Sequence, residues 1–396
     1  MKTIQDFSFE HKTALIRVDF NVPLDAQKKV SDDTRIRAAI PTINEVLKSG
    51  GKVVLMSHLG RPKGITPELS LAPVAQHLST LVDAKVNFTP HTFGAEAKAA
   101  VAALQAGEIL LLENLRFYAE ETKGDRDFAK ALAELGDIYI NDAFGTAHRA
   151  HASTAVIAEF MDNKCFGFLI EGELTSIDKA LNSGRKPLTA IVGGAKVSSK
   201  ITIMENLLSS VDHMIVGGGM AFTFVKALGG NTGSSLVEED QIATAKSILA
   251  AAKEQGVSIH LPTDALCADA FSNDANTQVS DIMDIADGWM GLDIGDKTIA
   301  QYCDVIHQSG TILWNGPMGV FEMEKFQKGT KEVALALASA TKEKDTFTLI
   351  GGGDSVAAIN LFQLANDVSY VSTGGGAMLE YLEGKELPGI AAIKNQ

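Results

Sequence analysis

The chain has 396 residues, of which 45% are hydrophobic and 21% are charged, and its formal net charge at pH 7 is −14. That length exceeds what one hydrophobic core usually organises, so two domains are expected. The acidic balance excludes a protein that binds nucleic acid or a membrane surface through a broadly basic face. It is compatible with an anionic small substrate, because salt screens exposed charges beyond about 8–10 Å.

No apolar run approaches the ~20 residues that cross a bilayer, and residues 1–17 lack the apolar region of a signal peptide. The three cysteines, Cys165, Cys267 and Cys303, are widely spaced and form no CxxC pair. They predict reduced, buried thiols in a cytoplasmic protein, and neither a disulfide framework nor a zinc site.

Short apolar runs alternate with helical patterns along the chain, as expected for buried parallel strands in βαβ units. The first half contains the predicted strands 14–18, 52–56, 109–112 and 138–140. The second half contains 188–192, 213–216, 257–261, 311–313, 346–350 and 368–371. Predicted helices cover 33–47, 127–135, 241–255 and 329–340, with Asp32 or Asp33 capping the first and Gly50–Gly51 ending it. The pattern predicts an α/β fold with parallel sheets.

Arginine and glycine are concentrated in opposite halves of the chain. All eight arginines lie at or before Arg185, whereas 24 of the 36 glycines follow it. Arginine side chains suit phosphate and carboxylate oxygens, while glycine turns that open helices offer backbone N–H groups to a phosphate chain. The first half therefore predicts a small-anion site and the second a nucleotide site, which together suggest phosphoryl transfer. The polar stretch 171–182 is the expected domain boundary.

In the first half, polar and cationic residues follow each predicted strand, where the carboxyl ends of parallel strands meet at one sheet edge. Taken singly, these residues are often solvated, capping or ion-paired, but their convergence favours an anion site. They are found in 19–23 (Asp-Phe-Asn-Val-Pro), 32–37 (with Arg35 and Arg37), 57–62 (Ser-His-Leu-Gly-Arg-Pro), 113–117 (with Arg116) and 141–151 (with His148, Arg149 and His151).

Asp19 supports a competing interpretation, because haloacid-dehalogenase-type phosphatases present a nucleophilic aspartate in an Asp-x-Asp motif after a strand. Here the second position is Asn21, followed by Val22-Pro23 in place of Gly-Thr. These differences disfavour a nucleophilic role for Asp19.

In the second half, glycine-containing turns follow five predicted strands, at 193–196, 217–219, 315–317, 351–355 and 373–376. Neither GxxxxGK[ST] nor GxGxxG occurs, and the HRD and DFG elements of protein kinases are absent. Lys196 and Lys200 are predicted to share one face at a helix start, where lysine follows a moving phosphoryl group. Asp354 is either a Mg²⁺ ligand or a helix N-cap.

Together these segments resemble phosphoglycerate kinase, from residue 17 to residue 390. The resemblance is strongest at 17–23, 57–62, 141–151, 193–197, 313–322 and 372–377. It implies two doubly wound parallel-sheet, Rossmann-like domains joined by a helix, with a cleft between them. The implied limits are 1–170 for a 3-phosphoglycerate domain onto which the tail 384–396 packs, 171–183 for the interdomain helix or hinge, and 184–383 for a Mg-nucleotide domain.

The resemblance also assigns site residues. Arg35, Lys196, Gly374 and Gly375 would be catalytic, and Asp354 would hold Mg²⁺. The substrate would contact Asp19, Asn21, Arg35, His58, Leu59, Gly60, Arg61, Arg116 and Arg149. The nucleotide would lie near Lys200, Gly291, Asn315, Glu322, Gly352, Gly353, Asp354 and Ser355. Departures from the family pattern are Ser199, Asp296 and Met378, and none removes a proposed charge or phosphate donor.

The implied activity is that of a glycolytic phosphotransferase with a carboxyl group as acceptor. It would move a phosphoryl group reversibly from 1,3-bisphosphoglycerate to ADP, giving ATP and 3-phosphoglycerate, with hinge closure of the domains. No nucleic acid, membrane or subunit partner is expected, so the protein would be a cytoplasmic monomer. The alternatives are a non-catalytic binding module on the same fold and the Asp19 phosphatase.

Overall fold

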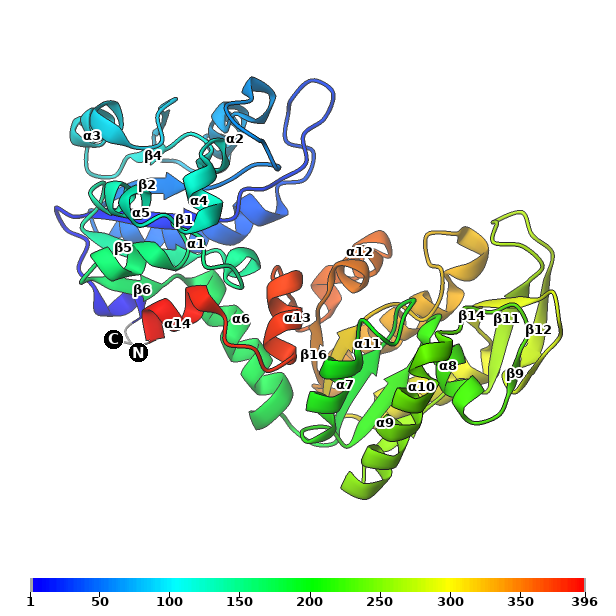
Figure 1. Cartoon of the computed structure of the whole chain (residues 1–396). Coiled ribbons are helices and arrows are strands. Elements are labelled where there is room, and N and C mark those ends of the chain that lie inside the picture. Colours follow the sequence, from blue (N-terminus) through cyan, green and yellow to red (C-terminus); the bar gives the residue numbers. More distant parts are fainter. Residues whose placement is uncertain (1–2, 395–396) are drawn as a thin grey trace. The chain divides into compact units, whose positions relative to one another are not determined.

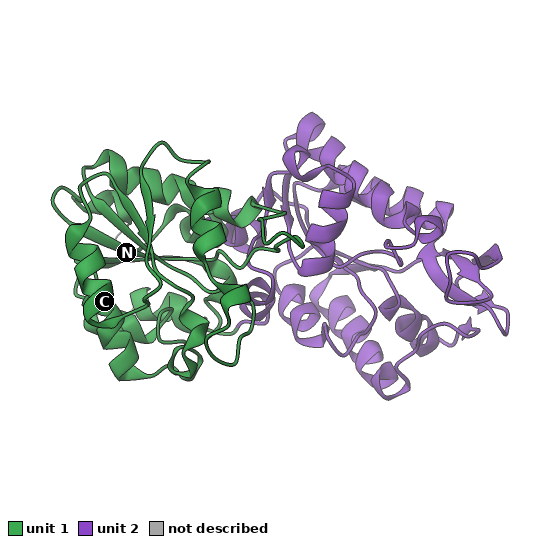
Figure 2. Ribbon diagram, turned by 90° about the horizontal axis from the view of Figure 1, so that it is seen from above, with its two compact units in different colours: residues 1–174, 385–396 green, residues 175–384 purple. Residues whose placement is uncertain are grey.

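The structure, a computed structural model, describes residues 3–394. The chain forms two compact units (Figure 2). The first contains the residues up to Leu174 together with those from Lys385 onward, and the second is Thr175–Gly384. Within the described residues, no helix is both long and apolar enough to cross a membrane.

The first unit is built on a six-stranded parallel sheet in the order β3-β4-β2-β1-β5-β6 (Figure 1). The chain adds strands on one side of β1 and then continues on its other side with β5, so the order reverses between these two central strands. Ligands of doubly wound sheets bind beyond the carboxyl ends of the strands at such a point. The strands are β1 (Thr13–Val18), β2 (Lys52–Met56), β3 (Val86–Phe88), β4 (Ile109–Leu111), β5 (Ile138–Asp142) and β6 (Lys164–Phe166).

Helices bury both faces of this sheet. One face, with Ile16 and Leu55, packs with Ile36 and Ile43 of α1 in one apolar cluster. The alternate strand residues, such as Leu15, are fully buried as well, and because successive strand residues point to opposite faces, both faces are covered. The helices are α1 (Thr34–Lys48), α2 (Ala72–Leu78), α3 (Gly94–Ala103), α4 (Ala119–Lys123), α5 (Arg126–Ala133), α6 (Phe168–Asp178) and α14 (Pro388–Lys394), which returns to pack beside β6.

The second unit repeats this plan with the strand order β10-β8-β7-β15-β16-β17, again all parallel. Here the order reverses between β7 and β15. The strands are β7 (Leu188–Val192), β8 (His213–Val216), β10 (Ser258–His260), β15 (Thr311–Asn315), β16 (Phe347–Ile350) and β17 (Tyr370–Val371).

The core of the second unit lies between this sheet and its helices, where Trp314 of β15 is fully buried with Tyr302 of α10 and Leu337 of α11. The helices are α7 (Ile201–Leu208), α8 (Met220–Ala227), α9 (Ile242–Gln255), α10 (Asp296–Gln308), α11 (Lys328–Lys344), α12 (Gly353–Leu361) and α13 (Gly376–Leu382). The predicted α/β fold with two doubly wound sheets is confirmed, and each of the ten predicted strands has its counterpart.

Two small sheets of the second unit were not predicted. An antiparallel sheet has the order β12-β11-β14, and β13 pairs in parallel with β9. Their strands are β9 (Asn231–Thr232), β11 (Asp264–Ala268), β12 (Thr277–Asp281), β13 (Asp284–Ile285) and β14 (Met290–Ile294). β9, β12 and β13 are polar or only two residues long and lack the apolar runs on which the prediction relied, whereas β11 and β14 are mostly apolar and were missed.

One expectation at a helix start is confirmed and a second needs correction. Asp33 is the N-cap of α1, as predicted, although its carboxylate makes no capping hydrogen bond. It accepts instead from Arg37 Nε at 2.9 Å and contacts His77 Nε2 at 3.0 Å, whereas Asp32 accepts from the Thr34 N–H. Lys196 and Lys200 do not share a helical face, because α7 begins only at Ile201 with Lys200 as its N-cap.

Candidate active site

A polar network follows β1 at the carboxyl edge of the first sheet. Arg35, one residue into α1, donates from Nη1 to Asp19 Oδ2 at 3.0 Å and to the Asn21 carbonyl oxygen at 3.2 Å. The Asn21 Oδ1 atom in turn accepts from the Gly60 N–H at 2.8 Å. The loops after β1 and β2 and the start of α1 are therefore fixed together, as the sequence predicted for this edge.

Arg116 joins the same edge from the 3-10 turn after β4. Its Nη1 donates to the Gly60 carbonyl oxygen at 2.8 Å. The amide group of the buried Asn114 side chain makes two hydrogen bonds to the backbone of Leu59. Its Oδ1 accepts from the Leu59 N–H at 3.2 Å, and its Nδ2 donates to the Leu59 carbonyl oxygen at 2.8 Å. Leu59 and Gly60 are thus held by backbone contacts, and the Leu59 side chain belongs to the apolar core.

Arg17 is a member of this cluster that the predicted site omitted, although it lies in 17–23, one of the segments in which the resemblance is strongest. It is 1% exposed, and its Nη2 lies 3.2 Å from His58 Nδ1. Because a guanidinium group only donates hydrogen bonds, His58 Nδ1 must be the acceptor and its Nε2 must carry the proton. The signal that could have identified Arg17 is an arginine inside an otherwise apolar strand.

The cluster is strongly cationic. Burial, followed by the charges of Arg17, Arg116 and Arg35, lowers the pKa of His58 well below its usual value. The pKa of Arg116 is also lowered, by burial and by Arg17 and Arg149. Burial and neighbouring arginines lower the pKa of His151 to about 4. Groups that disfavour each other's positive charge in this way are stabilised by a bound anion.

Two predicted substrate residues are more peripheral. Arg61 is exposed in the loop after Gly60, and Arg149 is exposed in the segment after β5. Arg149 is close enough to affect the pKa values of Arg116 and His151. No hydrogen bond joins the Arg61 side chain to the other cluster residues among residues 3–394, so Arg61 is free to reach a ligand.

The glycine turns of the second unit pack closely at the carboxyl ends of β7 and β15. The Gly193 N–H donates to the Asn315 carbonyl oxygen at 3.0 Å. A Cβ on Gly193 would lie 2.2 Å from the Pro317 carbonyl oxygen, and one on Gly316, whose φ is +112°, would lie 2.1 Å from that of Gly193. These turns need glycine because the two backbones touch.

A half-buried lysine, Lys200, spans the same edge. Lys200 Nζ donates to Asn315 Oδ1, and Asn315 Nδ2 donates to the Gly351 carbonyl oxygen at 3.2 Å. Burial lowers the pKa of Lys200, while Asp354 and Glu383 raise it. Ser355 Oγ accepts from the Gly316 N–H at 2.5 Å. The structure therefore brings together Lys200, Asn315 and the turn 351–355, as predicted.

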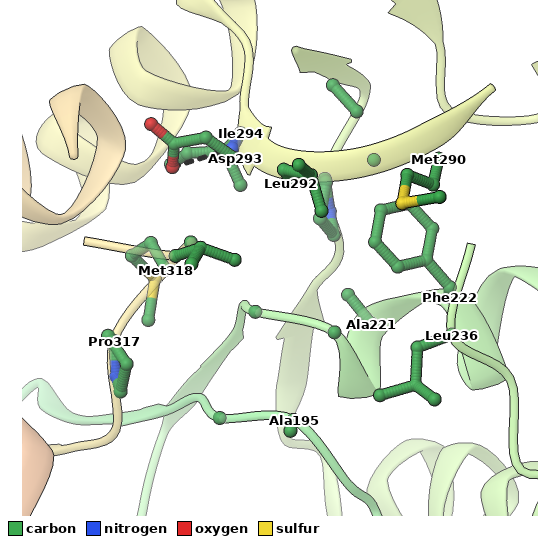
Figure 3. A pocket seen from close by; sticks show the side chains of 18 of the residues that line it. Ala195, Ala221, Phe222, Leu236, Met290, Leu292, Asp293, Ile294, Pro317 and Met318 are labelled. Carbon is green, nitrogen blue, oxygen red and sulfur yellow. Dashed lines mark hydrogen bonds between the residues drawn. The ribbon is translucent and has the colours of Figure 1, made fainter. Parts of the chain in front are cut away.

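A pocket of about 680 Å³ lies beside these turns (Figure 3). Its walls are largely apolar, with Phe222, Leu236 and Met290 grouped on one side and Pro317 and Met318 on the other. The predicted nucleotide residues Gly291, Glu322 and Asp354 all line it. A volume of this size with apolar walls and a few polar groups suits a small organic ligand. Sequence reasoning missed most of these walls, which come from segments far apart in the chain.

The remaining predicted residues are accessible or partly engaged. Lys196 and Gly353 are exposed, as is Asp354 in the first turn of α12. Gly352, whose φ is +88°, is the N-cap of α12, so Asp354 is not the cap. Gly375 precedes α13 with a φ of +48°, and the Gly374 N–H already donates to Ser372 Oγ at 3.0 Å.

Residues 3–394 contain no cluster of three or more His, Cys, Asp or Glu side chains that could hold a metal ion. This donor set still fits Mg²⁺, which is usually bound by one or two carboxylates together with water and substrate phosphates. The exposed Asp354 carboxylate at the edge of the pocket is the side chain that would hold the ion there.

A cationic side-chain cluster at the edge of one sheet and a glycine-framed pocket beside the other are the arrangement expected of a phosphotransferase. The sequence profile of phosphoglycerate kinase matches residues 4–385. The chain belongs to the phosphoglycerate kinase family.

Similar proteins support this assignment. A "Phosphoglycerate kinase" from Herpetosiphon aurantiacus is 54% identical over 396 residues, covering 100% of this chain and 99% of the relative. "Phosphoglycerate kinase 3, cytosolic" from Arabidopsis thaliana is 52% identical over 391 residues, covering 99% and 97%. The structure of phosphoglycerate kinase from Coxiella burnetii is 41% identical with a TM-score of 0.90, covering 100% and 98%.

Proposed function

We propose that the protein catalyses reversible phosphoryl transfer from 1,3-bisphosphoglycerate to ADP, giving ATP and 3-phosphoglycerate, as a step of glycolysis and gluconeogenesis. The observation that carries the proposal is the division of the site: a cationic cluster on the first sheet and a nucleotide-sized pocket on the second. Both are formed by a chain that matches the family along nearly its whole length.

The first unit binds the phosphoglycerate in this proposal. Arg116 and the buried Arg17 are fixed by hydrogen bonds to the scaffold, whereas Arg61 and Arg149 are exposed. Fixed guanidinium groups recognise carboxylate and phosphate oxygens with defined geometry, and mobile ones add charge at the rim. Asp19 and Asn21 orient Arg35 and the Gly60 loop.

The second unit binds the nucleotide. The apolar pocket holds the base, with Gly291 and Glu322 among its lining residues. Phosphates follow the glycine turns toward the start of α12, where the N-terminal N–H groups of the helix favour an anion. Lys200, Asn315 and residues 352–355 lie at this end of the site. Mg²⁺ held at Asp354, when bound, neutralises the charge of the nucleotide phosphates.

The transfer itself needs no protein nucleophile. An oxygen of the ADP β-phosphate forms a bond to the transferred phosphorus, and the bond from phosphorus to the carboxyl oxygen breaks, leaving 3-phosphoglycerate as a carboxylate. No proton is moved. Arg35 and Lys196 steady the equatorial oxygens of the phosphoryl group, and N–H groups at Gly374 and Gly375 add fixed dipoles. For Gly374 this requires Ser372 Oγ to release its N–H.

Both carboxylate oxygens of Asp19 accept hydrogen bonds, from Arg35 Nη1 at 3.0 Å and from the Asn21 N–H at 3.3 Å. A carboxylate held in this way orients an arginine and is a poor nucleophile. The phosphatase alternative therefore gains no support from the geometry.

Because the two substrates bind to different units, the proposal requires the units to close until the reacting atoms are about 3–3.5 Å apart. Closure also excludes water, which would hydrolyse the acyl phosphate. The stretch 171–183, which contains most of α6 and the π-helical turn Lys179–Ser183, is the proposed hinge between a 3-phosphoglycerate domain (1–170 with 384–396) and a nucleotide domain (184–383).

We also propose that the protein is a cytoplasmic monomer. Its three cysteines are free, with Cys165 and Cys267 buried, and one relative is named cytosolic. Light scattering of the purified protein would test this proposal. A monomer should give one species near the chain mass of 42.0 kDa.

The deciding experiment measures phosphoryl transfer from ATP to 3-phosphoglycerate, with a coupled dehydrogenase consuming the acyl phosphate. Transfer should require ATP, 3-phosphoglycerate and Mg²⁺ together, and chelation of the metal should stop it. Folded protein that binds both ligands but transfers nothing would support the non-catalytic binding module instead.

A further inference from the structure

A buried acidic residue lies behind the cationic cluster. Glu121 of α4 is 1% exposed, and its carboxylate faces the segment after β5. Its Oε1 accepts from Ser153 Oγ at 2.6 Å, and its Oε2 accepts from the Ser153 N–H at 3.0 Å. A buried carboxylate is costly unless it is paired and hydrogen-bonded. Glu121 must therefore have a cationic counterpart.

That counterpart is Arg17, reached through the hydroxyl group of Ser153. Arg17 Nε lies 2.9 Å from Ser153 Oγ. Because guanidinium only donates, the serine oxygen accepts here, and its single hydrogen is left for Glu121. Arg17 Nε–H therefore donates to Ser153 Oγ, and the Ser153 hydroxyl group in turn donates to Glu121 Oε1. Both charges and the hydroxyl between them are almost fully buried.

The far side of the Arg17 guanidinium group faces the site. Its Nη2 donates to His58 Nδ1 at 3.2 Å, and its Nη1 donates to the Val18 carbonyl oxygen. Loss of the bond at Nε would leave the bond to the Val18 carbonyl oxygen to hold Nη2 toward His58, so the guanidinium group could tilt away from His58. The contacts of Glu121 therefore help to set the tautomer of His58. In that tautomer, the Nε2–H group is the donor left for a ligand.

Glu121 also offsets the repulsion within the cluster. Its charge raises the pKa of Arg116, against the lowering caused by Arg17 and Arg149. Its Oε1 lies 3.9 Å from His151 Nδ1. One buried negative charge behind several cations lets them remain close together before any substrate binds.

We infer that Glu121, acting through Ser153, is a positioning residue that holds Arg17 and thereby fixes His58 in its Nε2–H form for binding the phosphoglycerate. This inference rests on the proposed function for the identity of the ligand. It concerns a residue that makes no contact with the substrate itself.

The test is Glu121→Gln, which keeps the size of the side chain but removes its charge and one of its two acceptors. We expect the KM for 3-phosphoglycerate to rise about tenfold or more, as for misplaced binding groups, while the KM for ATP changes less than twofold. Ser153→Ala should produce the same pattern, and the double variant should be little worse than either single one, since both remove the same connection.

A spectroscopic measurement on the unligated protein separates positioning from general destabilisation. In the wild type, the ¹⁵N resonances of His58 should show a protonated Nε2 and an acceptor Nδ1, and in Glu121→Gln they should move toward a mixture of tautomers. Leu132→Ala in α5 is the matched control: it removes buried apolar contacts and lowers Tm, but it should leave both His58 and the KM values unchanged.

If Glu121→Gln lowers Tm but keeps the wild-type His58 tautomer and the KM for 3-phosphoglycerate, its role is structural and the inference is wrong. Absence of transfer by the wild-type protein would contradict the proposed function instead. The ¹⁵N measurement needs neither substrate nor turnover, so it still decides whether Glu121 positions His58.

Discussion

Arg35 Nη1 lies 3.0 Å from Asp19 Oδ2, and the same nitrogen donates to the Asn21 carbonyl oxygen at 3.2 Å. The Arg35 side chain is nevertheless 41% exposed, whereas that of Asp19 is 12% exposed. The carboxylate therefore holds one edge of an arginine whose other N–H groups stay accessible. This is how a negative group can serve in an anion site: it orients the cation that the substrate meets.

We expect Arg35→Ala to lower kcat about 100-fold, the size of effect seen when a stabiliser of transition-state charge is removed. Arg37→Ala is the matched control, because Arg37 lies two residues away on the same helix and pairs with Asp33 at the surface, where such pairs contribute little. Steady-state kinetics of both variants check this. Near-normal turnover of Arg35→Ala would show that Arg35 has no part in the transfer.

Lys196→Ala should also reduce kcat about 100-fold, because its mobile charge is proposed to follow the phosphoryl group. Lys196 is exposed in the loop before α7, so its removal should leave Tm unchanged. Lys246→Ala, an exposed lysine of α9, is the control and should keep full activity. Equal kcat values for the two variants would exclude Lys196 from the mechanism.

Much of the fold and the charged part of the site could be predicted from the sequence. Apolar runs marked the central strands, because strands of a parallel sheet are buried on both faces. Arg35, His58 and Arg116 were found because each follows a strand end or begins a helix, and parallel strands bring those positions to one edge.

The parts that could not be predicted depend on side-chain packing between distant segments. Nothing in the local sequence links Arg17 to Ser153, 136 residues further on, or Phe222 to Gly291, which lie against each other in the pocket wall. The three-residue strands β3 and β6 were missed because each contains a polar residue, Asn87 or Lys164, that shortens its apolar run. The prediction that Lys196 lies on the face of α7 was wrong. The residue at which a helix begins is hard to predict when glycines and serines precede it.

Gly291→Ala should weaken nucleotide binding. A Cβ at this position would lie 2.1 Å from Phe222 Cζ, so the ring must shift, and this changes the shape of the pocket that both residues line. Overpacking typically costs about 1–3 kcal/mol, and we expect the KM for ATP to rise about tenfold with little change in that for 3-phosphoglycerate.

Two further variants test the cause of the Gly291→Ala effect. Combining it with Phe222→Leu should recover part of the ATP affinity lost in Gly291→Ala, because a smaller side chain makes room for the added methyl group. Gly64→Ala, where a Cβ would meet nothing within 4 Å, should leave both KM values unchanged. If Gly291→Ala binds ATP as the wild type does, the pocket is not the nucleotide site.

The stability of the first unit should depend on pH through Asp142, at the end of β5. Its Oδ1 accepts from the Leu169 N–H in the first turn of α6 at 3.0 Å, and the side chain is fully buried. Burial raises the pKa of this carboxyl group from 3.8 to about 7. Between these values the folded protein keeps a proton that the unfolded chain has released, so the free energy of unfolding falls as the pH rises.

Asp142→Asn has no proton to release in this range. The Tm of the variant minus that of the wild type should therefore rise from pH 5 to pH 7 and then level off, because above pH 7 both forms of the wild type are ionised. Asp293, whose pKa is also raised to about 7 by burial, is present in both proteins and cancels in the difference. Thermal unfolding followed by circular dichroism measures this difference in Tm. A Tm difference that does not change with pH would show that Asp142 is already ionised in the folded protein.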